Sequence, residues 1–157
     1  MLPYKHIFLG AIFSYVIFLL FPQIEVLGFL IIFFSSFLID VDHYIYYACK
    51  KKDFSLKRAV KWFFKNRDIL LNYSSKKRKE FYTGIYFLHG IEILVVLGLL
   101  IFVSEYFLYV LIGFLFHIIS DIIYLILTKN RISKISLISD FLKSKKLKLV
   151  GEEKQNQ

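Results

Sequence analysis

The stretch YFLYVLIGFLFHIISDIIYLIL, residues 106–127, is apolar along its whole length except where it carries His117, Ser120 and Asp121. A helix needs about 20 mainly apolar residues to cross a bilayer, and this stretch is long enough. Ionisable side chains are costly in hydrocarbon, so their presence there indicates a functional role. His117 and Asp121 are four residues apart and therefore share one face of the helix. The stretch predicts both a membrane span and a polar site within it.

The rest of the chain is also rich in apolar residues, and its basic residues are confined to the stretches between and beside the apolar ones. The chain has 157 residues, 57% of them hydrophobic, and 21 Lys and Arg. None of these 21 lies between Lys5 and Lys50 or between Lys79 and Lys129. Each gap has room for two apolar helices, and the expected fold is an all-α polytopic membrane bundle of about four transmembrane helices plus amphipathic cytoplasmic helices. The expected spans are residues 6–21, 24–39, 81–103 and 106–127.

The placement of the basic residues also predicts topology. With four spans, every Lys and Arg falls on one side of the membrane, which the positive-inside rule identifies as cytoplasmic. We therefore expect a multi-pass protein of the cell (inner) membrane with both termini in the cytoplasm. Residues 1–128 would form the membrane domain, with a basic cytoplasmic segment inserted at 49–80, and residues 129–157 would form a basic tail. A signal peptide is the weaker interpretation of residues 1–21, because no small-residue cleavage site follows them.

The inserted segment has the pattern of an amphipathic helix. Residues 54–71, FSLKRAVKWFFKNRDILL, place apolar and basic side chains on different sides of a helix, and the tail repeats this more weakly around Ile135, Ile138, Phe141 and Leu142. Such helices can lie on a membrane and bind anionic head groups, although a solvated basic flank of a span has the same composition. Nucleic acid is a weaker account of the net charge of +9, because topology alone explains it. The expected faces are Leu56, Val60 and Phe63 on one side, and Lys57, Lys61 and Lys65 on the other.

The candidate site gathers all four histidines of the chain with several carboxylates. A rise of about 1.5 Å per residue puts all of these groups in the cytoplasmic half of the bilayer. With a single cysteine, thiolate zinc sites are excluded, and His with carboxylate suits zinc, manganese or iron, with enough candidates for two ions. A proton or ion relay, or structural hydrogen bonding, are the alternatives. The residues are His6, Asp40, Asp42, His43, His89, Glu92, His117 and Asp121.

The order of these motifs resembles the membrane-bound metal-dependent hydrolases, a family that includes LexA-regulated inner-membrane members. The similarity covers residues 6 to about 121 and rests on an early histidine, an Asp-x-Asp-His, a later histidine and a final His-x-x-x-Asp. Many family members carry an Arg and two histidines around the third motif, where this chain has His89-Gly90-Ile91-Glu92. The motifs are His6, then Asp40, Asp42 and His43, then His89, then His117 and Asp121.

The resemblance implies a hydrolase, and the residues suggest its chemistry. We expect a divalent ion, zinc or manganese foremost, to activate water against a small-molecule or lipid substrate, in particular a lipid-linked phosphoester at the cytoplasmic leaflet. The catalytic candidates are Glu92, as general base or as a group that orients a ligand, and Asp42. The main alternative is a divalent-cation or proton-coupled transporter or a metal sensor, and a membrane scaffold is a third. The expected ligands are His6, Asp40, Asp42, His43, His89, His117 and Asp121.

Overall fold

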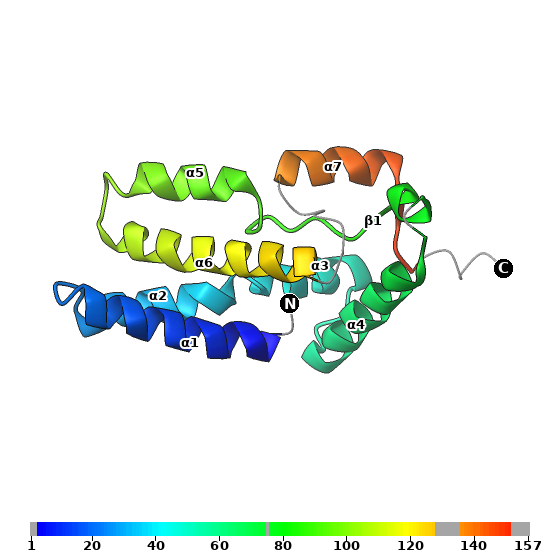
Figure 1. Ribbon diagram of the computed structural model, residues 1–157. Coiled ribbons are helices and arrows are strands. Elements are labelled where there is room, and N and C mark those ends of the chain that lie inside the picture. The colour runs from blue at the N-terminus through cyan, green and yellow to red at the C-terminus, as the bar shows by residue number, and fades with distance from the viewer. Residues whose placement is uncertain (1–2, 75, 128–135, 152–157) are drawn as a thin grey trace. The chain divides into compact units, whose positions relative to one another are not determined.

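The computed structural model describes residues 3–74, 76–127 and 136–151, and most of them are helical (Figure 1). The expected all-α class is confirmed, with a single two-residue strand pair added to it. The elements divide into two units: α1, α2, α5 and α6 form the first, and the remaining elements form the second. In chain order they are α1 (Pro3–Leu20), α2 (Val26–Leu38), α3 (Val41–Lys51), α4 (Leu56–Asn72), η1 (Lys77–Glu80), β1 (Phe81–Tyr82), α5 (Ile91–Leu100), α6 (Tyr106–Leu127), α7 (Leu137–Lys146) and β2 (Lys148–Leu149).

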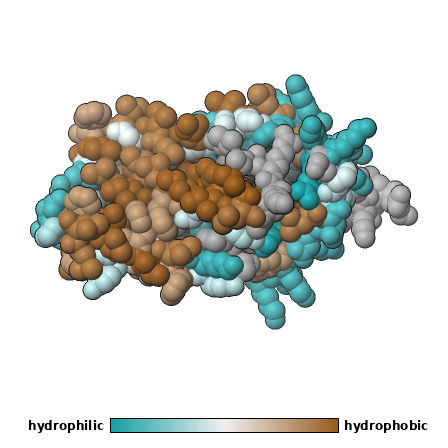
Figure 2. All heavy atoms as spheres, viewed as in Figure 1, coloured by the Kyte–Doolittle hydropathy of each residue, from teal (hydrophilic) through white to brown (hydrophobic). Residues whose placement is uncertain are grey.

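In the first unit, α6 lies between α5 on one side and α1 and α2 on the other (Figure 1). Its core joins Ile39, Leu97 and Phe114, from the end of α2 and from α5 and α6. Many of its other apolar side chains are exposed, and Figure 2 shows apolar residues gathered over these helices. An apolar surface of this extent is unusual for a protein surrounded by water and is typical of one that faces lipid.

Small residues let α2 approach both of its neighbours closely. A Cβ atom on Gly10 of α1 would overlap the Ser36 hydroxyl, and a Cβ on Gly113 of α6 would overlap the Ser35 hydroxyl. Both hydroxyls are satisfied within α2, since Ser35 donates to the Ile31 carbonyl at 2.6 Å and Ser36 donates to a carbonyl one turn back. Glycine and serine therefore act here as packing residues, as is usual between membrane helices.

Among the residues that the structure describes, two helical segments are long and apolar enough to cross a membrane, Val26–Lys51 and Tyr106–Leu127. The first combines α2 and α3, which a two-residue turn at Ile39 and Asp40 separates. Two shorter apolar helices, Tyr4–Leu20 and Ile91–Leu100, accompany them.

The expected continuous span over 81–103 is wrong. Its helical part is α5 alone, whose 10 residues extend about 15 Å, half of a hydrocarbon core of about 30 Å. Two glycines explain the difference. Gly84 has a φ of +146°, which side chains rarely allow, and Gly90 has the extended backbone of an N-cap, so the helix begins only after it.

In the second unit, α3 packs against α4, and β1 pairs in parallel with β2, Phe81 opposite Lys148 and Tyr82 opposite Leu149. The pair joins the segment that precedes α5 to the segment that follows α7. Buried side chains around it include Phe81, Leu149 and Val150. These two distant parts of the chain thus share one small core.

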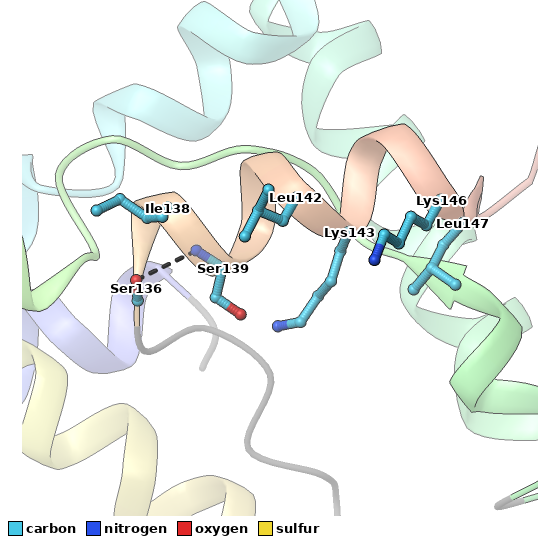
Figure 3. Close-up of a pocket in the computed structure, with 7 residues that line it drawn as sticks. All are labelled: Ser136, Ile138, Ser139, Leu142, Lys143, Lys146 and Leu147. Atoms are coloured by element: carbon cyan, nitrogen blue, oxygen red, sulfur yellow. Dashed lines mark hydrogen bonds between the residues drawn. The ribbon is translucent and has the colours of Figure 1, made fainter.

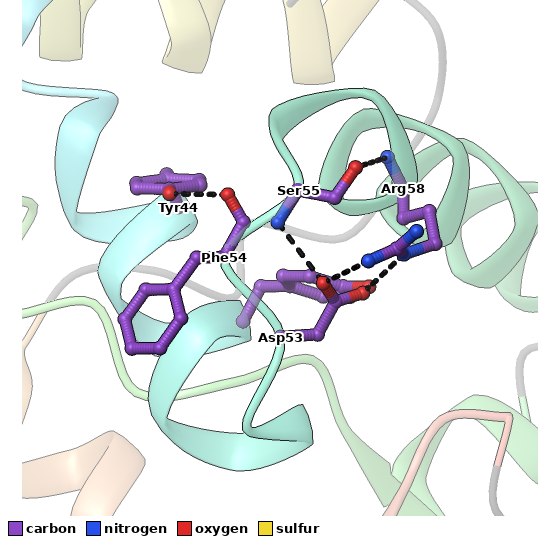
Figure 4. Close-up of polar contacts among 6 residues, drawn as sticks. Tyr44, Asp53, Phe54, Ser55 and Arg58 are labelled. Atoms are coloured by element: carbon purple, nitrogen blue, oxygen red, sulfur yellow. Dashed lines mark hydrogen bonds and ion pairs between the residues drawn. The ribbon is translucent and has the colours of Figure 1, made fainter.

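The turn from α3 to α4 is fixed by the carboxylate of Asp53 (Figure 4). Asp53 accepts hydrogen bonds from the backbone N–H of Ser55 at 3.0 Å, from Nε and Nη2 of Arg58 at 2.6 Å each, and from the hydroxyl of Tyr47 at 2.5 Å. The Arg58 guanidinium, followed by the Tyr47 hydroxyl, holds the pKa of the Asp53 carboxyl well below its usual range. The last turn of α3 and the first turn of α4 are therefore tied to one anion.

We predict that Gly113→Ala destabilises the protein while Gly98→Ala does not. The added methyl at 113 would meet the Ser35 hydroxyl and lie 2.7 Å from the Ile32 carbonyl oxygen, whereas nothing lies within 4 Å at 98. Overpacking costs about 1–3 kcal/mol, and Gly→Ala in an open helix stabilises by about 0.4–1 kcal/mol. Thermal unfolding in detergent measures both, and equal midpoints for the two variants would contradict the packing described above.

We also predict that Asp53→Asn loosens the α3–α4 turn. Because the pKa of Asp53 is lowered in the folded protein, its contribution to stability is complete above the ordinary value of about 3.9 and is lost as the pH falls below it. Amide-exchange protection of Ser55 and the first turn of α4 should fall in acid for the wild type. In the variant it should be low at neutral pH as well, and wild-type protection in the variant at neutral pH would be the contrary result.

Candidate metal site

Five of the expected site residues come together in the first unit, although they are far apart in the sequence. His6 lies in the first turns of α1, and Asp40 lies in the turn after α2. His89 stands just before the N-cap of α5, and His117 and Asp121 lie one turn apart on α6. Four separate segments of the chain therefore contribute to one cluster.

The contacts within the cluster centre on His117 and two carboxylates. Asp121 reaches two histidines, with Oδ1 3.1 Å from Nε2 of His6 and Oδ2 3.9 Å from Nε2 of His117. Oδ1 of Asp40 lies 3.4 Å from Nε2 of His89 and 3.6 Å from Nε2 of His117. The rings of His6 and His117 stack, with their centroids 3.9 Å apart and an interplanar angle of 13°.

These separations match those between ligands that share a metal ion. Ligand atoms at 2.0–2.1 Å from a tetrahedral ion lie roughly 3.3 Å from each other. Two groups of three residues in this unit could each hold an ion, since their ligand atoms lie within 4.8 Å of one another. The groups are His6, Asp40 and His117, and His89, His117 and Asp121.

A backbone hydrogen bond determines which nitrogen of His117 faces the cluster. Nδ1 of His117 is 2.8 Å from the carbonyl oxygen of Ser36, and because a carbonyl can only accept, this nitrogen carries the proton. In the neutral ring Nε2 is then an unprotonated acceptor directed at two carboxylates, and it has no hydrogen-bond partner. A carboxylate cannot donate to it, so an ion or a proton must lie between them. A carbonyl that accepts a hydrogen bond from the other ring nitrogen, and so fixes the tautomer, is typical of metal-bound histidine.

The charge of the cluster suits a divalent cation. Two carboxylates with three neutral imidazoles carry a charge of about −2, which one such ion neutralises. Both candidate groups include His117, and only Nε2 of that ring is available, so the two groups describe alternative ligand sets around one ion. A second ion would need ligands from outside these groups.

The cluster is closed on the histidine side and open on the carboxylate side. The side chains of His6, His89 and His117 are at most 4% exposed, whereas those of Asp121 and Asp40 are 18% and 27% exposed. Water or a substrate group can therefore approach the ligands from the side of the two carboxylates.

Three of the expected residues belong to neither of these two ligand groups. Asp42 and His43 are in the second unit, in the first turn of α3, because a new helix begins at Val41 after the turn at Ile39 and Asp40. Asp42 is fully buried, with Oδ1 2.8 Å from Nδ1 of His43, whose ring stacks on Tyr86 at 3.9 Å.

Glu92 lies half-buried in the first turn of α5 and belongs to neither ligand group of the first unit. His89 precedes α5 and Glu92 lies within it, so the two residues do not share one helix face. The residue that sequence reasoning missed is Ser36, since a backbone carbonyl has no side-chain signature. Its position beside Ser35 in an apolar helix was the available signal.

The chain matches no family model, no curated protein and no solved structure. The resemblance to the membrane-bound metal-dependent hydrolases therefore stays a hypothesis that rests on the motifs alone.

We predict that the purified protein binds about one equivalent of zinc or manganese, and that His117→Ala and Asp40→Ala abolish this binding. Mass spectrometry of the detergent-purified protein measures the metal content. A ligand at about 100 times its Kd adds about 2.7 kcal/mol of stability, so added ion should also raise the unfolding temperature of the wild type and not of the variants.

The matched control is Ser14→Ala, which alters a fully buried α1 side chain that bonds only within its helix in the described structure. This variant should keep the ion. Metal retained by His117→Ala, or lost equally by Ser14→Ala, would contradict the assignment.

Proposed function

We propose that this protein is a membrane-embedded, metal-dependent hydrolase that acts on a lipid or lipid-linked phosphoester. The observation that carries the proposal is the buried His117 nitrogen, held in its acceptor form by Ser36 and directed at two carboxylates. A structural histidine would be satisfied by hydrogen bonds on both nitrogens. A ligand of a divalent ion has this arrangement.

The proposed setting is the cytoplasmic half of the cell membrane, with a multi-pass chain and both termini in the cytoplasm. Four apolar helices, two of them of membrane length, support this setting. The basic residues that flank them favour the cytoplasmic orientation. The exposed apolar surface around the cluster gives access to substrates with lipid tails.

The residues of the cluster have distinct roles in this proposal. One of the two ligand groups, either His6, Asp40 and His117 or His89, His117 and Asp121, would hold a divalent ion. A bound ion would supply Lewis-acid chemistry toward a phosphoryl oxygen and a water molecule. Ser36 keeps His117 in the tautomer that binds. The partly exposed carboxylate side admits the water and the phosphoester, while the buried histidines exclude other solvent.

Two further acids are catalytic candidates. Glu92 lies in the first turn of α5, three residues after His89, where a carboxylate can accept a proton from the attacking water or orient a ligand. Asp42 is fully buried against His43, so it is suited to orienting that ring and not to meeting substrate. Both His43 and Asp42 remain proposed members of the site on the basis of the sequence motif.

We predict that Glu92→Gln keeps the bound ion and lowers phosphoester hydrolysis by about 10²–10⁴-fold, the usual contribution of a general base. His117→Ala should lose both the ion and the activity. Hydrolysis of phospholipid and lipid-linked diphosphate in mixed micelles, with and without a chelator, is the measurement, and Ser14→Ala is the control.

The alternative, a transporter or sensor, uses the same ligands reversibly. It predicts that the metal-loaded wild type hydrolyses none of these substrates but carries the ion into sealed vesicles. That combination of results would replace the hydrolase proposal.

A further inference from the structure

Helix α4 exposes an apolar stripe. Leu56, Val60 and Phe64 recur every four residues and are 63%, 40% and 36% exposed, and Phe54, just before the helix, is 81% exposed. Residues at this spacing lie on one face of a helix. In the described parts of the chain, the stripe is therefore an apolar surface that the protein itself leaves uncovered.

The other aromatic residues of α4 have a different environment. Trp62 packs near Tyr46 and Tyr47, with ring centroids 6.4 and 5.7 Å away, and Phe63 packs edge-on against His43. Phe63 follows Val60 by three residues and so shares its side of the helix, as expected, but it lies at the edge of that side where α4 contacts α3. The apolar residues of α4 thus form two faces, one that binds α3 and one that is free of the described core.

A line of lysines runs beside the exposed stripe. Lys57, Lys61 and Lys65 each follow a residue of the stripe by one position, about 100° around the helix, and all three are exposed. An apolar stripe with lysines at its edge is the pattern of a helix that lies in the interface of an anionic membrane.

The chain connection brings α4 close to the membrane. The membrane-length segment Val26–Lys51 ends five residues before Leu56, and extended chain covers at most about 3.6 Å per residue, so α4 begins within about 18 Å of that end. The contact of Asp53 with Tyr47 and its contact with Arg58, which Figure 4 shows, fix this turn.

We propose that α4 docks on the anionic leaflet, with Leu56, Val60 and Phe64 among the acyl chains and Lys57, Lys61 and Lys65 on the lipid phosphates. The partner is a lipid surface of negative charge, and not a protein or a nucleic acid. A membrane surface places anionic head groups directly above apolar acyl chains, and lysines beside an apolar stripe match these two layers. This surface includes none of the five residues of the histidine and aspartate cluster, and the proposal does not depend on the proposed hydrolysis.

Helix α7 also combines exposed apolar side chains with lysines. Ile138, Phe141 and Leu142 are exposed, and Ile138 and Leu142 line a shallow groove with Lys143 and Lys146 (Figure 3). Nζ of Lys143 lies 3.0 Å from Oδ1 of Asp140, so α7 has fewer lysine charges available for lipid phosphates. We therefore assign the principal contact to α4.

The test places a nitroxide label at position 64 of the full-length protein, as Phe64→Cys in a Cys49→Ser background. The protein is reconstituted into nanodiscs of phosphatidylcholine, with or without phosphatidylglycerol. Electron paramagnetic resonance measures the collision rate of the label with oxygen, which concentrates in lipid, and with a water-soluble nickel complex. We expect phosphatidylglycerol to raise the ratio of oxygen to nickel collisions several-fold, and high salt to reverse this change.

The charge variant is Lys61→Gln with Lys65→Gln, and its matched control is Lys76→Gln with Lys79→Gln, two exposed lysines outside α4. Loss of two interfacial lysines should shift the docking equilibrium by about 30-fold in anionic discs, and the control should shift it little. All four lysines are exposed, and circular dichroism checks that both variants keep their helices.

A label that stays equally accessible to nickel in both lipids would overturn the proposal. So would equal loss of docking in the charge variant and its control. Protection that is independent of lipid charge and rises with the number of protein copies per disc would assign the stripe to a second copy of the chain instead. Metal content and hydrolysis should be unchanged in the charge variant, so a failure here is separable from a failure of the proposed function.

Discussion

The close approach of α2 to α1 and α6 is the constraint on which the candidate site depends. Glycine on each neighbouring helix faces serine on α2. A Cβ at Gly113 would meet the backbone of α2, and a Cβ at Gly10 would meet the Ser36 side chain. This approach brings the Ser36 carbonyl within 2.8 Å of His117. Backbone packing therefore sets which nitrogen of the neutral imidazole carries the proton, and it leaves Nε2 able to bind a metal ion.

The two units use charge in opposite ways. In the second unit, the anion of Asp53 is fully engaged by donors, so it has a structural function at the α3–α4 turn. In the first unit, Asp40 and Asp121 face imidazole nitrogens, of which those of His6 and His117 lack hydrogen-bond partners. The Asp53 carboxylate stabilises a turn, whereas carboxylates beside several imidazole nitrogens form a position that could hold a cation.

Hydrophobic periodicity predicted α1, α2, α4 and α6 because their apolar runs are uninterrupted or strongly amphipathic, and the spacing of His117 and Asp121 placed both on one face of α6. It failed over residues 81–103, where hydropathy is high but Gly84 and Gly90 favour non-helical backbone. The co-occurrence of His6, Asp40 and His89 with the α6 pair was predictable from their shared depth. The role of the Ser36 carbonyl was not, because it arises from helix packing between residues 81 positions apart.

The order of the ligands along the chain has a consequence for biosynthesis. His6 precedes the other four residues of the cluster and Asp121 follows them, so no partial chain that lacks α6 contains a complete cluster. Until α6 is made, His6 has neither its ring partner nor its carboxylate. An ion bound at this cluster would therefore distinguish a chain that includes a folded α6 from one that does not.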